Sequence, residues 1–108
     1  METIKKLEKN GIHFSFEELV ELCEKYYLSE LSIFGSSLRD DFNGESDIDI
    51  LVSWKNYQKF NKPWDFINIE EDFKVLFNRK VDIVEKEALS NPIRRQDILA
   101  QSEILYAN

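Results

Sequence analysis

Apolar residues recur at helical spacing in the first quarter of the chain. Residues 2–9 are mostly polar, with Ile4 and Leu7 as their apolar positions, and the following Asn10-Gly11 is typical of a helix end. Ser15 and Glu18 form a capping-box pattern in front of a second apolar stripe. The spacing therefore predicts two N-terminal helices within residues 1–28, the second burying Leu19, Leu22, Cys23 and Tyr26.

The next segment reads as two strands joined by a glycine turn. Residues 31–34 predict a short buried strand that leads into Gly35-Ser36-Ser37, where we expect a helix to open and run through Leu38 and Arg39. Residues 47–52 alternate as a strand should, because side chains two apart share a face. One face is predicted to carry Asp47, Asp49 and Leu51, and the core face Ile48, Ile50 and Val52.

The second half of the chain predicts a helix, a strand and a final helix. Residues 54–62 have no clear period and read as a loop, whereas Pro63 suits the first turn of a helix. Residues 81–84 predict a third strand with Asp82 and Val84 on one side. Asn91-Pro92 is expected to begin a last helix that runs through Leu105, a heptad after Ile98. Together the elements predict an α/β fold, a small mixed β-sheet of three to four strands flanked by helices.

Length and charge narrow the class of protein. A chain of 108 residues is expected to form one domain with a single core, so an active site must be shallow or shared. The net charge of −7 argues against coating of nucleic acid or anionic lipid. One cysteine, no secretory signal and no membrane-spanning apolar run predict a cytoplasmic protein without direct nucleic-acid or membrane binding.

The chemistry points to Asp47 and Asp49, which share one face of a strand that otherwise looks central. Two carboxylates about 6 Å apart repel by about 3 kcal/mol at an effective dielectric of about 20. A cation bound between them makes the net electrostatic energy favourable. Mg²⁺, with Mn²⁺ as a substitute, suits such an all-oxygen pair and completes its shell with water and phosphate oxygens. Gly35-Ser36 can hold those phosphates if the two strands pair, and Asp82 can join as a further ligand or as a base.

These residues resemble a known superfamily. Gly35-Ser36, ten intervening residues, Asp47-Ile48-Asp49 and then Asp82 in a V-D-I-V strand are similar to the nucleotidyltransferases typified by DNA polymerase beta. The short length resembles the minimal nucleotidyltransferase (MNT) branch. The likeness runs over residues 31–105, so the expected organisation is a single nucleotidyltransferase domain, residues 1–108, with that stretch as its core.

The resemblance implies an activity and roles for single residues. The family transfers a nucleoside monophosphate from a nucleoside triphosphate to a hydroxyl. By this likeness Asp47, Asp49 and Asp82 would be the catalytic and Mg²⁺-binding carboxylates, while Gly35, Ser36 and Arg39 would bind the nucleotide, ATP. Residues 40 and 41 are Asp-Asp where the family often has small or basic residues.

The same resemblance implies a partner. The MNT branch resembles the antitoxins of HEPN-domain toxins, which add AMP to a toxin tyrosine. The acidic composition is compatible with such pairing, because an acidic domain complements a basic ribonuclease surface. The acceptor hydroxyl, the nucleotide base and the homo- or hetero-oligomeric state are left open by the residues themselves.

Two other functions are compatible with the sequence. In one, the chain is a non-catalytic binding module that neutralises its partner by masking a surface. In the other, it modifies a small molecule of the aminoglycoside type, although such enzymes usually add a substrate-binding domain. Several residues also have plain structural readings: Arg39 can pair with Asp40 and Asp41, and surface or core positions are expected for His13, Arg94, Arg95 and the aromatics Trp54, Tyr57, Phe60 and Trp64.

Overall fold

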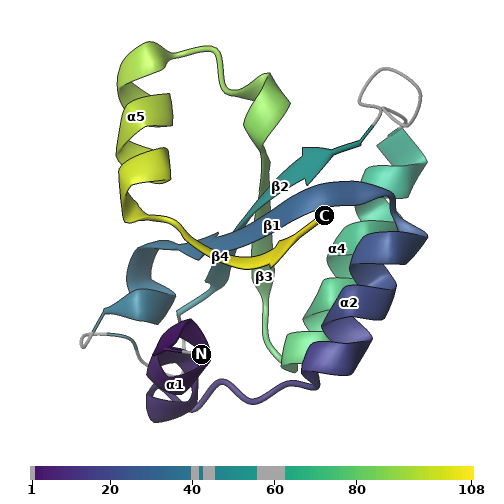
Figure 1. Cartoon of the computed structure of the whole chain (residues 1–108), viewed down its shortest axis with the longest axis vertical. Coiled ribbons are helices and arrows are strands. Elements are labelled where there is room, and N and C mark those ends of the chain that lie inside the picture. Colours follow the sequence, from purple (N-terminus) through teal and green to yellow (C-terminus); the bar gives the residue numbers. More distant parts are fainter. Residues whose placement is uncertain (1, 40–41, 43–45, 56–62) are drawn as a thin grey trace.

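The protein forms a four-stranded mixed β-sheet with helices packed around it (Figure 1). The computed structural model describes residues 2–39, 42, 46–55 and 63–108. The predicted α/β class with a small mixed sheet is confirmed. The elements in chain order are α1 (Glu2–Lys9), α2 (Phe16–Lys25), β1 (Leu28–Phe34), the 3₁₀ turn η1 (Gly35–Leu38), β2 (Ile48–Trp54), α4 (Pro63–Phe77), β3 (Val81–Glu85), the 3₁₀ turn η2 (Lys86–Ala88), α5 (Pro92–Gln101) and β4 (Glu103–Ala107).

The sheet order is β3-β2-β1-β4. β1 pairs antiparallel with both β2 and β4, whereas β2 and β3 run parallel and are connected through α4. A parallel pair needs such a crossover, because a tight hairpin can join only antiparallel strands. This topology brings the end of β1 together with the starts of β2 and β3, as the pairs Phe34–Asp49 and Asp49–Asp82 show. These strand ends form one edge of the sheet, at which the site residues lie.

Helices α2 and α4 cover one face of the sheet, on the right in Figure 1. The N-cap prediction is confirmed, since the Glu18 amide donates to Ser15 Oγ at 3.2 Å. Burying each large apolar side chain contributes about 1.5–3 kcal/mol. The helix and strand residues that form this core are fully or almost fully buried: Leu19, Cys23, Leu31, Ile33, Ile48, Ile50, Val52, Ile69, Phe73, Phe77, Val81 and Ile83.

The predicted final helix is wrong in its second half. α5 ends at Gln101, and Ser102 adopts an extended conformation (φ −80°, ψ 146°), after which residues 103–107 form β4. The heptad pair is indeed buried, but Ile98 lies on a helix and Leu105 on a strand. Without β4, β1 would present an open edge of unpaired backbone groups. The Ile104-Leu105-Tyr106 run, rich in strand-forming residues, pairs with that edge instead of continuing the helix.

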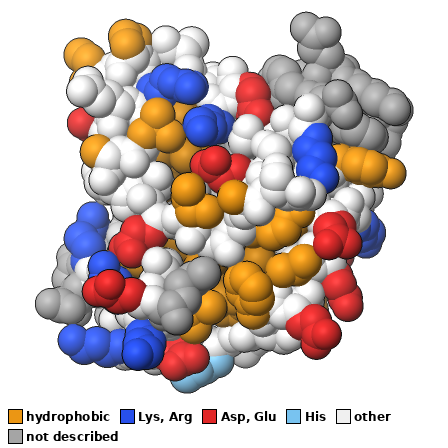
Figure 2. Space-filling model, viewed as in Figure 1, with side chains coloured by type: hydrophobic (Ala, Val, Ile, Leu, Met, Phe, Trp, Pro, Cys, Tyr) orange, Lys and Arg blue, Asp and Glu red, His pale blue; other side chains and the backbone are white. Residues whose placement is uncertain are grey.

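Acidic and apolar side chains occupy different parts of the surface. Figure 2 shows apolar side chains across the middle of one face, and acidic ones along its right edge, over α2. α2 alone contributes four glutamates and one lysine. No helix in the described part of the chain is long and apolar enough to cross a membrane.

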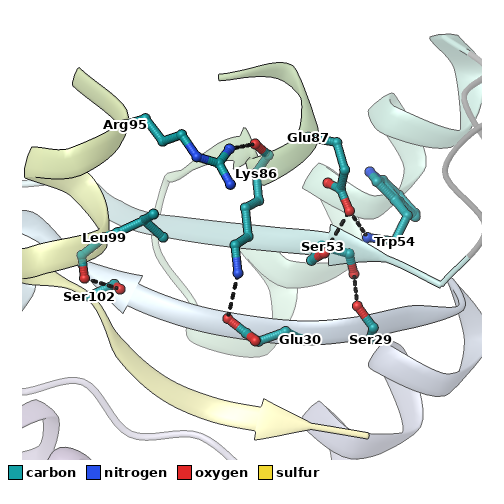
Figure 3. Close-up of polar contacts among 9 residues, drawn as sticks. All are labelled: Ser29, Glu30, Ser53, Trp54, Lys86, Glu87, Arg95, Leu99 and Ser102. Carbon is teal, nitrogen blue, oxygen red and sulfur yellow. Dashed lines mark hydrogen bonds and ion pairs between the residues drawn. The ribbon is translucent and has the colours of Figure 1, made fainter. Parts of the chain in front are cut away.

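On the opposite face of the sheet, polar contacts hold η2 and α5 (Figure 3). Glu87 accepts from Ser53 Oγ at 2.6 Å and from the Trp54 amide at 2.8 Å, and Lys86 pairs with Glu30 at 3.6 Å. The predicted alternation of β2 is confirmed, but Leu51 is also buried, at 2% exposed, so this face is covered at its centre. Asp49 lies on the same face, nearer the start of the strand.

Candidate functional site

The turn after β1 is sharper than the sequence pattern predicts. Instead of a helix through Arg39, the chain makes one 3₁₀ turn at Gly35–Leu38, and Arg39 is extended. Gly35 has φ +79°, a left-handed conformation that glycine adopts without strain. Serines at positions 36 and 37 are poor residues for a helix interior, because their hydroxyls compete for backbone groups. The result is a short loop whose backbone lies at the sheet edge.

Gly35 and Asp49 lie against each other. Phe34 is the register partner of Asp49, so the chain turns away from β1 directly beside that carboxylate. A Cβ atom placed on Gly35 would overlap Asp49 Oδ2 and would lie 3.4 Å from Asp49 Cγ. Any other residue at position 35 would therefore displace the carboxylate. The glycine of the predicted phosphate loop is also the residue that makes room for a predicted metal ligand.

The predicted carboxylates come together at this edge. Asp82 on β3 is the register partner of Asp49 on β2, so the two side chains project from the same face of the sheet. Asp47 comes two residues before Asp49, directly ahead of β2, and belongs to the same face by alternation. Asp47 and Asp82 are exposed, whereas Asp49 is half-buried. The three acids thus form an open group, accessible from outside.

The surroundings of Asp49 shift the pKa of its carboxyl group. Partial burial is the main cause that raises the pKa of the Asp49 carboxyl, and the negative charges of Asp82 and then Asp47 raise it further. The Arg39 guanidinium acts in the opposite direction and lowers the pKa of Asp49. Three of the residues singled out from the sequence, Asp82, Asp47 and Arg39, are therefore close enough to influence the Asp49 carboxyl group. A positive ligand at this place would relieve the repulsion.

The remaining predicted nucleotide residues lie on the turn. Ser36 is half-buried, and its carbonyl accepts from the Arg39 amide at 3.0 Å. Arg39 is exposed at the end of the turn. The neighbouring Ser37 is fully buried, and its hydroxyl has no hydrogen-bond partner among the residues that the structure describes. Asp40 and Asp41, expected to pair with Arg39 or to add charge here, lie outside the described residues.

Two residues that the sequence reasoning missed hold the backbone around the site. Arg79 places its guanidinium 4.6 Å from the centre of the Phe42 ring and donates to the Ser46 carbonyl at 3.3 Å, which fixes the approach to Asp47. Asn10 donates from its side chain to the carbonyls of Ser37 and Arg39. A sequence pattern marks Asn10 only as part of a helix end, since both contacts depend on the tertiary fold.

The three aspartates are suitable as cation ligands, but their side chains are not arranged as a complete coordination site. Among the residues described, no three His, Cys, Asp or Glu side chains are grouped so as to hold a metal ion. The donor chemistry nevertheless fits a hard divalent cation, because Asp47, Asp49 and Asp82 offer only carboxylate oxygens. Ligation by all three would require these side chains to turn from the positions they have here.

Other residues considered from the sequence lie away from this edge or make structural contacts. His13 and Arg94 are exposed, and Arg95 donates to the Lys86 carbonyl at 2.9 Å (Figure 3). Trp54 is buried at 7% exposed, which confirms core packing for that aromatic. Tyr57, Phe60 and the side chain of Trp64 lie outside the described residues.

A groove of about 400 Å³ lies between α2 and α4, with Leu22 and Leu76 in its lining. These helices cover the face of the sheet opposite to Asp49. None of the predicted site residues lines this groove. The groove is therefore separate from the carboxylates at the end of β1.

Comparison with protein families identifies the family of the chain. The family model described as "Polymerase beta, Nucleotidyltransferase" matches residues 17–108. The chain belongs to the polymerase beta nucleotidyltransferase family. Two relatives support the assignment: the protein adenylyltransferase MntA of Thermococcus cleftensis, 35% identical over 69% of this chain and 73% of its own length, and a Methanocaldococcus jannaschii protein assigned provisionally as a protein adenylyltransferase, 35% identical over 79% and 82%.

Solved structures share the nucleotidyltransferase fold. A toxin–antitoxin structure with AMP-PNP superposes with a TM-score of 0.70 at 19% identity, over 87% of this chain and 74% of that chain. A tri-AMPylated Shewanella oneidensis HEPN toxin in complex with its MNT antitoxin gives a TM-score of 0.63 at 18% identity, over 94% and 73%. At these identities the likeness establishes the fold of this family member.

Proposed function

We propose that this nucleotidyltransferase is a protein adenylyltransferase, a single domain that transfers AMP from ATP to a hydroxyl group of a HEPN-type toxin and thereby neutralises it. The Thermococcus cleftensis relative carries the name protein adenylyltransferase, and similarly folded proteins occur with a tri-AMPylated HEPN toxin and with AMP-PNP. Those names concern the other proteins. For this chain, the support comes from shared family membership and from the residues at the sheet edge.

The contact between Gly35 and Asp49 is the observation that carries the proposal. A loop able to approach phosphates closely and a half-buried carboxylate occupy adjoining positions, and Asp82 is in register beside them. A structural edge has no need for three acids within electrostatic reach of one another, since their repulsion destabilises the fold. A site that binds a metal–triphosphate complex needs that arrangement.

Asp47, Asp49 and Asp82 would hold Mg²⁺, for which Mn²⁺ could substitute. When bound, the ion would neutralise charge on the carboxylates and phosphates and increase the electrophilicity of the α-phosphorus. The pKa of Asp49 is raised mainly by partial burial and then by the charges of Asp82 and Asp47, and a bound cation would offset that repulsion. Gly35, having no side chain, leaves Asp49 its space.

Gly35, Ser36 and Arg39 would bind the triphosphate. The turn offers a backbone that phosphate oxygens can approach closely, and Ser36 adds a hydroxyl donor. Arg39 would neutralise phosphate charge, which fits its position within electrostatic reach of Asp49. These roles account for each of the six predicted residues without requiring a deep pocket.

The transfer itself would be an in-line displacement. The acceptor oxygen forms a bond to the α-phosphorus as the bond from that phosphorus to the bridging oxygen breaks, and pyrophosphate leaves. The hydroxyl proton passes to a carboxylate, for which Asp82 is the candidate because it is exposed on the outer side of Asp49. An acceptor on another protein can reach such an open edge, whereas a small molecule would be enclosed on few sides.

A labelling assay tests the proposal. Wild-type protein with Mg²⁺, ATP labelled at the α-phosphate and the toxin encoded beside it is expected to label the toxin. ATP labelled at the γ-phosphate is expected to give no label, because that phosphate departs in pyrophosphate. The Asp47→Ala/Asp49→Ala double variant should lose transfer, and Asp97→Asn, an exposed acid on α5, should retain it.

Three outcomes contradict the proposal. No labelling by the wild type rejects adenylyl transfer to this acceptor. Undiminished neutralisation of the toxin by the double variant, in a stable complex, identifies a non-catalytic binding module instead. Transfer to an aminoglycoside in a panel assay, with no transfer to the toxin, identifies a small-molecule enzyme.

A further inference from the structure

Asn10 sits at a tightly structured helix end. α1 stops at Lys9, and Gly11 takes a left-handed conformation with φ +79°. The Ile12 amide donates to the Leu7 carbonyl at 2.9 Å, and the Gly11 amide donates to the Glu8 carbonyl at 3.0 Å. These two bonds form a Schellman motif in which Asn10 is the C-cap. Leu7 and Ile12 are buried, so the cap is fixed to the core and Asn10 projects from a rigid base.

From this base the Asn10 side chain reaches the turn that follows β1. Its Nδ2 donates to the Ser37 carbonyl at 2.8 Å and to the Arg39 carbonyl at 3.0 Å. Both acceptors are backbone carbonyls, so only the amide NH₂ can satisfy them. One side chain therefore holds the middle and the end of the turn at residues 35–39, from 27 and 29 residues away in the sequence.

The helix that carries Asn10 lies outside the region matched by the family model, which begins at residue 17. α1 is nevertheless anchored to the sheet. Thr3 Oγ1 donates to Glu103 Oε1 at 2.9 Å, and Lys6 Nζ pairs with Glu103 Oε2 at 3.1 Å. Figure 1 shows α1 beneath the turn after β1, at the end of the sheet where β2 begins. α1 thus links β4 to the loop beside the carboxylates.

We infer that Asn10 is a positioning residue that holds the turn at residues 35–39 in its nucleotide-binding conformation before nucleotide arrives. The inference rests on the proposed role of Gly35, Ser36 and Arg39 in binding triphosphate. Asn10 touches neither substrate nor reacting atoms in this scheme. It acts through the backbone, because a loop ordered in advance loses less conformational entropy on binding a ligand.

A positioning role has a specific kinetic signature. If the turn loses its two hydrogen bonds to Asn10, the cost of ordering it falls on nucleotide binding, so KM for ATP rises. Once ATP is bound, the same geometry is reached and kcat changes little. A purely structural role would instead reduce the fraction of folded enzyme, which lowers the apparent kcat and leaves KM unchanged.

Asn10→Ala and Thr3→Val form the matched pair for the test. Both remove side-chain hydrogen bonds of the same N-terminal segment, but those of Thr3 go to β4 and those of Asn10 to the turn. Asn10→Ala is expected to raise KM for ATP about tenfold with kcat within about twofold. A tenfold change corresponds to about 1.4 kcal/mol, less than two full hydrogen bonds because the bond to Arg39 is exposed to water. Thr3→Val should keep the wild-type KM. Equal KM values for wild type and Asn10→Ala would overturn the inference.

Hydrogen exchange without nucleotide separates this inference from the proposed function. The Arg39 amide, bonded to the Ser36 carbonyl, should exchange faster in Asn10→Ala than in wild type, and Thr3→Val should match wild type. Unchanged exchange in Asn10→Ala would reject the tether even in an active enzyme. Faster exchange in a protein that binds no ATP would support the tether and reject the nucleotide role of the turn.

Discussion

The Asp49 carboxylate fills the space that a side chain on Gly35 would need. Asp49 lies on β2, and Gly35 directly follows β1, the strand that pairs with β2. The positive φ of Gly35 turns the chain away at that point. The sharp turn at Gly35 and the position of the Asp49 carboxylate therefore both depend on residue 35 having no side chain. A substitution at position 35 is a sensitive test of the site for this reason.

Gly35→Ala should lose transfer activity and more stability than a comparable glycine substitution. The control is Gly11→Ala, because Gly11 also has φ +79° but a Cβ there would meet no atom within 4 Å. Each alanine bears the strain of a left-handed backbone, about 1–2 kcal/mol. Only Gly35→Ala also displaces Asp49. Urea unfolding is expected to show a larger loss for Gly35→Ala, and equal losses would contradict the overlap.

Asp49→Asn should abolish activity and stabilise the metal-free protein. The pKa of Asp49 is raised, so the folded protein binds this proton more tightly than the unfolded chain does, and the charged group opposes folding at pH 7. Removing the charge should increase the free energy of unfolding by about 1 kcal/mol in the presence of a chelator. Asp97→Asn is the control and should leave stability unchanged.

The gain from Asp49→Asn should depend on pH in a defined direction. It should be full at pH 7, shrink as the pH falls through the raised pKa of the folded state, and vanish below the ordinary value of 3.8. Denaturant titrations of both proteins between pH 7 and about pH 3.5 measure this. A gain that grows as the pH falls would show that the pKa of Asp49 is lowered instead.

The strands that carry the carboxylates, and the faces on which these lie, could be predicted because their signals are local. The alternation around Asp47 and Asp49, and the V-D-I-V strand with Asp82, identify strands whose faces follow from a period of two. The turn at Gly35 was placed correctly, although its helix was not. Two serines and a left-handed glycine reduce that predicted helix to one 3₁₀ turn.

The missed features depend on contacts between distant segments. Ile98 and Leu105 keep a helical spacing, and only the open edge of β1 explains why Leu105 belongs to a strand. The contacts of Asn10 and Arg79 with loop carbonyls likewise join residues 27 to 33 positions apart. Periodicity within one segment contains no information on such pairings. The site residues were therefore more predictable than the residues that hold them in place.

Tyr26→Phe should weaken the contact between α2 and α4. The Tyr26 hydroxyl donates to Asp72 Oδ2, and this bond, ahead of the Lys25 interactions, lowers the pKa of Asp72. The variant is expected to lose about 1 kcal/mol of unfolding free energy at pH 7. Lys25→Met should lose less, since that ammonium is 61% exposed and screened by water.

The contribution of Asp72 should disappear in acid. Because its pKa is lowered in the folded state, the stabilisation is present above the ordinary value of 3.8 and is lost as the pH falls through the folded pKa. Wild type and Tyr26→Phe should therefore converge in stability below that pH in denaturant titrations. A constant difference down to about pH 2.5 would indicate that the hydroxyl acts independently of the carboxylate charge.

Cys23 should resist alkylation as long as the protein is folded. Its side chain is fully buried, and burial is the main cause that raises the pKa of the thiol to about 12. Iodoacetamide at pH 8 should label it only through unfolding, so the labelling rate should rise with urea in step with the unfolded fraction. Rapid labelling of native protein would contradict the packing of α2 against the sheet.

The most direct test of the central claim is a crystal structure with Mn²⁺ and a non-hydrolysable ATP analogue, using the anomalous signal of manganese. We expect Mn²⁺ on the oxygens of Asp47 and Asp49 at about 2.0–2.6 Å, the range of hard divalent cations on oxygen, with Asp82 beside them and triphosphate oxygens against Gly35 and Ser36. Manganese bound elsewhere, or a nucleotide whose phosphates lie away from this turn while Asp49 has no metal contact, would contradict it.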